Sequence, residues 1–241
     1  MLRVGAHPTR SLKTMKEFYL WLSENQLILF AILIYIAQCF WLCKFQKSLK
    51  LRWAEIYLVP LGHVAIGWTC MWLLALIEVG FDMEKAANMR LYGAILVLPV
   101  LYYLWGRLTK KNISIVMDMA SVCVIFGAIS GRLNCFTVGC CQGVPIGNTR
   151  WPLREAEMVF YALFILIFAP RIAKGKTHGQ AYPLYLIMYG TLRFLSEFVR
   201  EEFTTQVGAL HLAHIWSLIS IVAGVIWYLQ VRKRIQLAKS R

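Results

Sequence analysis

The stretch SIVMDMASVCVIFGAISGRLNCFTVGCCQG, Ser114 to Gly143, decides the fold class of this chain. Its first part, 114–131, is almost entirely apolar, and its length approaches the roughly 20 residues that cross a bilayer as a helix. The second part, Gly131–Gly143, holds one arginine, one asparagine, three glycines and three of the seven cysteines. We therefore expect a membrane-spanning helix over 114–131, followed by a glycine-rich turn that carries Arg132 and the three cysteines.

The whole chain has the composition of a membrane protein. Of its 241 residues, 59% are hydrophobic and only 16% are charged, and the mean hydropathy is +0.57. Soluble domains carry about 25% charged residues. The net charge of +14 does not indicate nucleic acid, because the basic residues lie in short loops beside apolar stretches. We predict an all-α polytopic membrane protein, one domain over 1–241, with seven spans at 18–42, 56–79, 91–108, 114–131, 157–173, 181–199 and 211–231.

Charge asymmetry between the loops predicts the orientation. One side, made of loops 43–53, 107–113 and 171–178 and the C-terminus, carries 15 Lys or Arg and no acidic residue. The other side carries 10 Lys or Arg, diluted by five acidic residues. The positive-inside rule therefore predicts a cytoplasmic C-terminus and an external N-terminus. The turn at Gly131–Gly143 then lies at the outer face.

Four ionisable side chains fall within or at the start of predicted spans, where insertion of a charge costs roughly 2.5–3.5 kcal/mol. They are Asp118, Glu157, Arg193 and Glu197. In the span 181–199, polar residues follow a spacing of i, i+4, i+8 and i+11, which places them on one helical face. This face consists of Tyr189, Arg193, Glu197 and Arg200. It predicts either a structural ion pair between Arg193 and Glu197 or a polar cavity that opens outward.

An anion site is the functional interpretation of this pattern. Arg132, at the outer end of its span, is expected near Arg193, and two guanidinium groups suit a phosphate because each donates to phosphate oxygens as a planar fork. Glycines at 131, 139 and 143 allow the backbone to approach a ligand and present N–H groups to an anion.

The three cysteines of the turn have several interpretations. Cys135, Cys140 and Cys141 could chelate zinc, but a fourth ligand is not evident, and no other spacing predicts a metal site. An external disulfide, such as Cys135 with Cys140, thiols without a role, and a nucleophilic or lipid-accepting thiol all remain open. His63, in the middle of a span, is interpreted as a buried, hydrogen-bonded histidine.

Taken together, these motifs resemble the bacterial prolipoprotein diacylglyceryl transferases over about residues 90–231. The segment GQAYPLYLIMYGTLRFLSEFVR is similar to the pattern GQ…LY…YG..RF..E..R of that family. The segments GRLNCFTVGCCQG and WPLREAE are similar to its Gly-Arg signature and to its HP…YE segment. This chain departs from the family at Tyr92, where the family has a histidine, and at Cys140, where it has a glutamate.

The resemblance implies an activity and a set of site residues. It implies transfer of the diacylglyceryl group of phosphatidylglycerol to a cysteine thiol in the lipobox of a prolipoprotein, at the outer face of the bacterial cytoplasmic membrane, with no cofactor and no metal. The residues implied in catalysis are Tyr92, Arg132, Tyr189, Arg193 and Glu197. Those implied in substrate binding are Gly131, Gly139, Gly143, Glu157 and Arg200.

Two alternatives stay open. A non-catalytic protein that binds or transports phospholipid could share the fold while lacking the histidine. A membrane thiol oxidoreductase could use Cys135, Cys140 and Cys141, although vicinal cysteines are awkward partners for a disulfide.

Overall fold

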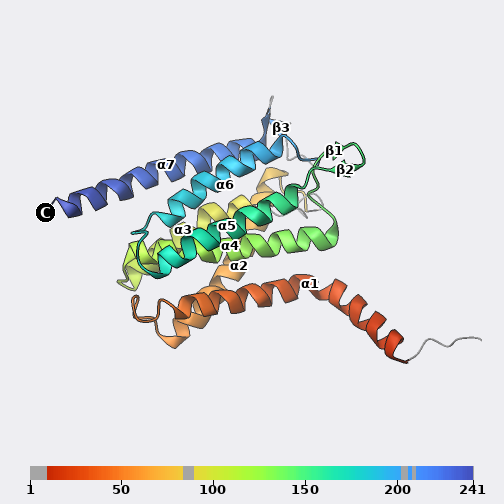
Figure 1. The fold of residues 1–241 in the computed structure, drawn as a ribbon, viewed down its shortest axis with the longest axis horizontal. Coiled ribbons are helices and arrows are strands. Elements are labelled where there is room, and N and C mark those ends of the chain that lie inside the picture. The colour runs from red at the N-terminus through yellow and green to blue at the C-terminus, as the bar shows by residue number, and fades with distance from the viewer. Residues whose placement is uncertain (1–9, 84–89, 202–205, 208–209, 241) are drawn as a thin grey trace, which may run out of the picture.

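Seven α-helices run back and forth along one long axis in the computed structural model, which describes residues 10–83, 90–201, 206–207 and 210–240 (Figure 1). The helices are α1 (Arg10–Cys43), α2 (Trp53–Glu78), α3 (Leu91–Leu108), α4 (Ile113–Val138), α5 (Leu153–Ala173), α6 (Ala181–Glu197) and α7 (Leu212–Lys239). Each predicted span corresponds to one of them. The largest differences are at the two ends of the chain, where α1 begins eight residues before the predicted start at 18 and α7 ends eight residues beyond the predicted end at 231. Helix α4 continues seven residues beyond the predicted end at 131.

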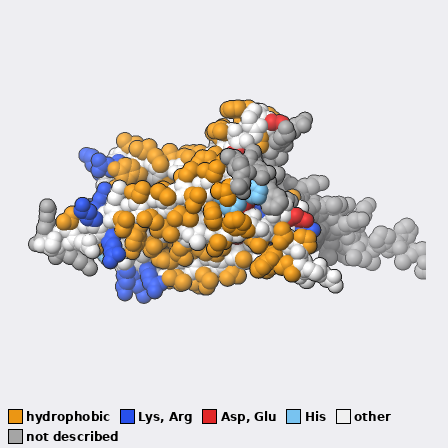
Figure 2. Space-filling model, turned by 90° about the horizontal axis from the view of Figure 1, so that it is seen from above, with side chains coloured by type: hydrophobic (Ala, Val, Ile, Leu, Met, Phe, Trp, Pro, Cys, Tyr) orange, Lys and Arg blue, Asp and Glu red, His pale blue; other side chains and the backbone are white. Residues whose placement is uncertain are grey.

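Six of the helices are long and apolar enough to cross a membrane. These stretches are Asn25–Cys43, Trp53–Glu78, Leu91–Leu108, Ile113–Val138, Leu153–Ala173 and Leu212–Ala238. The remaining helix, α6, has 17 residues and carries the buried Arg193 and Glu197. The chain is therefore a polytopic helical membrane protein, and much of its outer surface is hydrophobic (Figure 2).

The core of the bundle lies around α4. Asn112 caps this helix by accepting hydrogen bonds from the backbone N–H groups of Ser114 (3.0 Å) and Ile115 (3.4 Å). From α1, Gln38 donates to the carbonyl of Cys123 at 3.0 Å, and Trp41 donates to that of Met119 at 3.1 Å. These two buried donors attach α1 to α4.

Asp118 fixes the start of α6. Its carboxylate accepts hydrogen bonds from the Thr177 hydroxyl at 2.6 Å and from the backbone N–H groups of Gly179 (2.7 Å) and Ala181 (2.9 Å). The side chain is buried within α4. The ionisable residue that stood out in this span therefore has a structural explanation, since it anchors the loop 174–180 and the first turn of α6.

Two small antiparallel hairpins lie at one end of the bundle, and the sequence did not predict them. One pairs β1 (Pro145–Ile146) with β2 (Thr149–Arg150), and the other pairs β3 (Gln206–Val207) with β4 (Leu210–His211). The backbone of Val144 donates to Val199 O at 2.9 Å, and that of Glu201 donates to Gln142 O at 3.1 Å. These bonds join the loop after α4 to the segment after α6.

Basic side chains gather at the opposite end, where the C-terminus lies (Figure 2). Glu55, in the first turn of α2, also lies there and forms a salt bridge of 3.0 Å with Lys111. The basic N-terminal segment, whose charges were used to predict the orientation, lies partly outside the described residues, at 1–9.

Candidate functional site

Three arginines and two glutamates form a buried cluster at the end of the bundle that carries the two hairpins. Arg132 comes from the last third of α4, and Arg193 comes from α6. Arg200 follows the end of α6, and its backbone forms an isolated bridge with Gly143. Glu157 lies in the first turns of α5, and Glu197 is the last residue of α6. We call these five residues the arginine cluster.

Ion pairs connect all members of the arginine cluster. Glu157 contacts Arg132 through Oε2 and Arg200 through Oε1, the latter at 3.2 Å. Glu197 contacts Nη2 of Arg193 at 2.8 Å and Nε of Arg200 at 3.4 Å. The predicted pair between Arg193 and Glu197 is therefore present, but as part of a network. Arg200 lies beyond the helix and still reaches the cluster, because the chain turns back after Glu197.

The arginine cluster carries an excess positive charge. Three guanidinium groups face two carboxylates, which leaves a net charge of +1 among residues that are at most 9% exposed. Within the described part of the chain, Nη1 of Arg193 is buried and has no hydrogen-bond partner. Burial lowers the pKa of Arg200, and repulsion from Arg193 and Arg132 lowers it further. A buried cation with a spare donor is stabilised by an anionic ligand.

A cavity of about 440 Å³ adjoins the cluster. All three arginines line it, together with Tyr92 and Tyr189, whereas the two buried glutamates are not among its described lining residues. Much of the remaining lining is apolar, from α1, α2, α3 and α4, and includes Leu27, Ala31, Ile34, Val64, Leu98 and Val124. The cavity therefore has a cationic end and an apolar body, as a lipid with an anionic headgroup requires.

The two tyrosines that the sequence assigned to catalysis lie against each other. The rings of Tyr92 and Tyr189 meet edge to face with centroids 5.5 Å apart, and both residues are buried. The hydroxyl of Tyr92 lies 2.7 Å from that of Ser217, which itself donates to the carbonyl of Ala213 at 2.7 Å. Since the proton of Ser217 is used in that bond, Tyr92 donates its own proton to Ser217. This arrangement disfavours Tyr92 as a base.

The glycine-rich turn differs from the predicted one. We expected it to begin at Gly131, but Gly131 and Arg132 lie in α4, which ends at Val138. The six residues between Arg132 and Gly139 continue the helix. Gly139 then ends it in the left-handed conformation at φ +79°, as C-terminal glycines commonly do. At Gly143, a Cβ would lie 2.5 Å from Trp151, so the close approach of these two segments requires glycine.

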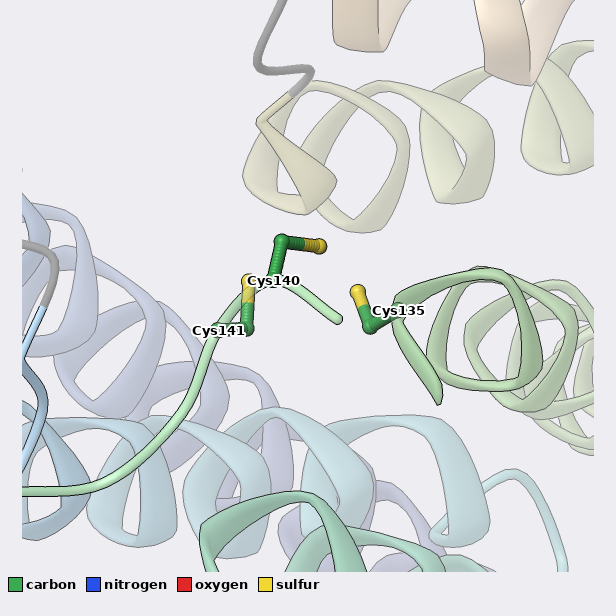
Figure 3. Close-up of side chains that lie close together, drawn as sticks. All are labelled: Cys135, Cys140 and Cys141. Carbon is green, nitrogen blue, oxygen red and sulfur yellow. The ribbon is translucent and has the colours of Figure 1, made fainter. Parts of the chain in front are cut away.

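Three cysteine thiols gather beside the arginine cluster. The sulfur atoms of Cys135, Cys140 and Cys141 all lie within 4.8 Å of one another, and all three residues line the cavity. Figure 3 shows Cys135 on α4 pointing toward the loop that carries the other two. A hydrogen bond from Cys135 lowers the pKa of Cys141 to about 4, and nearby Arg132 and Arg200 lower it as well, although burial raises it. These contacts favour the thiolate form of Cys141.

Several residues of this region escaped the sequence reasoning. Glu78 joins α2 to the rim of the cavity by accepting from Arg90 at 2.7 Å and from the indole of Trp216 at 2.8 Å. Ser217, which holds Tyr92, is a plain serine in an apolar helix. The position of Glu78, an ionisable residue near the end of a span, is a signal that could have identified it in the sequence. No such signal exists for Ser217. His63 agrees with its interpretation: it is buried, and its Nδ1 lies 2.9 Å from the hydroxyl of Tyr102.

Comparison with known proteins gives a consistent result. The sequence model described as prolipoprotein diacylglyceryl transferase matches residues 27–230. Proteins named phosphatidylglycerol–prolipoprotein diacylglyceryl transferase are similar to this chain. The Clostridium tetani protein is 28% identical over 153 residues, which cover 56% of this chain and 61% of that protein. The Finegoldia magna protein is 28% identical over 172 residues, which cover 65% and 66% of the two chains. The Dehalococcoides mccartyi protein is 25% identical over 170 residues, which cover 63% and 65%.

The matched part of this chain thus spans slightly less than two thirds of the length of these relatives. The family match includes the whole arginine cluster and most of the apolar helices. The resemblance noted in the sequence is therefore confirmed, and the chain is a multi-pass protein of the bacterial cytoplasmic membrane. It belongs to the prolipoprotein diacylglyceryl transferase family.

Proposed function

We propose that this chain transfers the diacylglyceryl group of phosphatidylglycerol to a cysteine thiol of a prolipoprotein. The observation that carries the proposal is the arginine cluster at one end of a largely apolar cavity inside a membrane bundle. Acyl chains fit the apolar lining from α1 to α4, and the phosphate fits the cationic end. The names of the relatives, which mention both substrates, support the same assignment.

The arginine cluster has the parts that phosphate binding requires. Arg193 has a spare buried donor at Nη1, and Arg132, whose Nε pairs with Glu157, makes a long contact of 3.8 Å from Nη1 to the sulfur of Cys135. Glu157 and Glu197 hold the guanidinium groups in place from the side away from the cavity lining. We therefore assign Arg132 and Arg193 to the phosphate, and both glutamates to positioning of the arginines.

The reaction moves one carbon from oxygen to sulfur. The thiolate of the acceptor attacks the glycerol carbon of the diacylglyceryl group, a C–S bond forms, and the C–O bond to phosphate breaks. The electron pair of that bond goes to the phosphate oxygen, so glycerol phosphate leaves as an anion. Preorganised guanidinium groups stabilise this developing charge. Tyr92 and Tyr189 lie at the same end and shape the site beside the phosphate.

We also propose that all seven helices span the membrane, with the C-terminus in the cytoplasm and the N-terminus outside. The gathering of basic side chains at the C-terminal end supports this orientation (Figure 2). The arginine cluster then opens at the outer face. In intact spheroplasts, a membrane-impermeant maleimide should label the Thr149→Cys variant, whose position is exposed in β2, and should leave the exposed Cys43 unmodified. Labelling of Cys43 alone would show that the chain has the opposite orientation.

The transfer activity is tested directly with purified protein, phosphatidylglycerol and a lipobox peptide. We expect the peptide to gain the mass of one diacylglyceryl group and glycerol phosphate to be released. Arg132→Gln and Arg193→Gln should each slow the reaction by about 10²–10³-fold, as loss of a charge-stabilising donor does. The matched control is Arg150→Gln, because Arg150 pairs with Glu201 at the same end of the bundle but is exposed.

The outcomes separate the proposal from its rival. Retention of phosphatidylglycerol without peptide modification or release of glycerol phosphate would identify a non-catalytic lipid-binding protein. The substitution of the family histidine by Tyr92, whose hydroxyl is engaged with Ser217, is the observation that favours this rival. Equal turnover by both cluster variants and Arg150→Gln would refute the phosphate assignment.

A further inference from the structure

The reaction proposed above makes no use of the three thiols beside the arginine cluster. Cys135 lies in the last turn of α4, and Cys140 and Cys141 follow Gly139 directly. Their sulfur atoms lie within 4.8 Å of one another and face the same cavity as the arginines. No fourth histidine, cysteine, aspartate or glutamate joins this group among the residues that the structure describes.

The backbone of the turn is arranged to bring these sulfurs together. Cys141 adopts a left-handed conformation at φ +58°, which residues other than glycine rarely do. Two backbone hydrogen bonds with the segment after α6 hold this conformation in place: the carbonyl of Gln142 accepts at 3.1 Å, and the N–H of Val144 donates at 2.9 Å. A fixed, uncommon backbone conformation beside a cavity is typical of functional sites.

The sulfur positions fit a metal ion with thiolate ligands. Zn–S bonds of about 2.3 Å at tetrahedral angles place the sulfurs about 3.8 Å apart, so the present separation of up to 4.8 Å requires a closure of about 1 Å. Rotation about the Cα–Cβ bonds of these half-buried cysteines moves the sulfur atoms and provides that closure. Three protein ligands with a fourth position open to a cavity are the pattern of a catalytic zinc site, whereas structural sites have four protein ligands.

The charge of the surroundings favours Zn²⁺ over Cu⁺, the other ion that thiolates select. Three thiolates with Zn²⁺ have a net charge of −1, which the net +1 of the arginine cluster balances. With Cu⁺ the site would have a charge of −2. Arg132 also reaches Cys135 from Nη1 at 3.8 Å, as an outer-sphere donor to a metal-bound thiolate would.

We propose that Cys135, Cys140 and Cys141 bind one Zn²⁺ ion whose fourth coordination position faces the cavity, and that the acceptor thiol binds there as a thiolate. The binding of the acceptor thiol at zinc rests on the proposed transfer activity, whereas the binding of Zn²⁺ by the three cysteines does not. The site also answers a need of that reaction, since Tyr92 stands in place of the histidine and its own proton is engaged with Ser217.

The chemical step balances without a further reactant. The acceptor thiol displaces a water molecule from zinc and releases its proton to solvent, because a coordinating thiol is deprotonated by the metal. Its sulfur then attacks the glycerol carbon, and the phosphate oxygen takes the electron pair of the broken C–O bond. The product is a neutral thioether, a weak ligand that leaves zinc, and water returns to the fourth position.

Metal binding is measured on the purified, reduced full chain in detergent, with Zn²⁺ alone and no lipid. We expect one Zn²⁺ per chain, and with Co²⁺ in its place a thiolate-to-cobalt charge-transfer band with the visible spectrum of a tetrahedral site. Cys135→Ser, Cys140→Ser and Cys141→Ser should each weaken binding by more than about 100-fold, since even the loss of outer-sphere partners costs 10–100-fold. Cys43→Ser and Cys70→Ser are the matched controls and should bind as the parent chain does.

Size-exclusion profiles and circular dichroism of each variant distinguish loss of a ligand from loss of the fold. A folded parent chain that binds no Zn²⁺ would overturn the proposal. Equal binding by folded Cys135→Ser and the controls would overturn it as well, and so would binding of Cu⁺ alone.

The open fourth position is tested on the Co²⁺ form with thiols. A small thiol, 2-mercaptoethanol, should shift and strengthen the charge-transfer band, and a lipobox peptide should do so at lower concentration than its Cys→Ser counterpart. An unchanged spectrum with the small thiol would refute the open position. If the small thiol binds and the peptide shows no preference, the zinc site stands and the proposed acceptor is wrong. Transfer at an unchanged rate by zinc-free protein would leave the transferase proposal intact and refute the role of zinc.

Discussion

Removal of the negative charge of Glu157 should destabilise the protein by about 3 kcal/mol. Glu157 is 1% exposed and contacts both Arg132 and Arg200. Glu157→Gln preserves the shape of the side chain but raises the net charge of the arginine cluster from +1 to +2. Breaking a buried ion pair by removing one partner costs about 3–5 kcal/mol. Because Arg200 keeps its contact with Glu197 at 3.4 Å, we expect the lower end of this range.

The assay is equilibrium unfolding in mixed detergent micelles with increasing dodecyl sulfate. The matched control is Glu201→Gln, since Glu201 also pairs with an arginine, Arg150, but both side chains are 44% exposed. An exposed pair contributes about 0–1 kcal/mol. Glycerol phosphate should also stabilise Glu157→Gln more than the parent chain, because the variant has the greater excess of positive charge. Equal midpoints for the two variants, with no effect of the anion, would refute this account of the cluster.

Three further substitutions test other parts of the structure. Asp118→Ala removes the acceptor of three hydrogen bonds at the start of α6 and should cost about 3 kcal/mol or more in the same unfolding assay, whereas the exposed Glu155→Ala should be nearly neutral. Tyr92→Phe should slow transfer by less than about tenfold, since Tyr92 donates to Ser217; a loss of 10²–10⁴ would show that it handles the reacting proton. Gly143→Ala should destabilise the protein by about 1–3 kcal/mol, because the new Cβ clashes with Trp151. Gly131→Ala should be neutral or stabilising, because Gly131 lies inside α4 with open space around its Cβ position. The reverse order of melting temperatures would contradict the helical assignment of Gly131.

The helices and one face of the site could be predicted from local sequence. Apolar stretches of sufficient length indicated all seven helices, because burial in lipid dominates the choice of structure there. The spacing of Tyr189, Arg193 and Glu197 indicated a common buried face, since the period of an α-helix is independent of tertiary context. The ends of the helices were harder to predict. The pair Gly131 and Arg132 suggested a turn, although the following residues continue α4 to Val138.

Contacts between distant segments could not be predicted in this way. Glu157 was suspected as a misplaced charge, but its position between Arg132 and Arg200 depends on how α5 packs beside α4 and on the path of the chain after α6. The bond between Tyr92 and Ser217 joins residues 125 positions apart. The hairpins are two residues per strand, too short for any alternation of polar and apolar residues to appear. The pairing of the loop after α4 with the segment after α6 sets the position of Cys141, and it too depends on contacts between distant segments.

The central claim is that Arg132 and Arg193 hold the phosphate of a lipid headgroup. It is tested most directly by the affinity for phosphatidylglycerol of protein in nanodiscs of phosphatidylcholine. Each lost charge-assisted hydrogen bond is worth about 1.5–3 kcal/mol, so Arg132→Gln and Arg193→Gln should each weaken binding by about 10–100-fold, and Arg150→Gln should not. Parent-like affinity in both cluster variants, with their fold intact, would contradict the account.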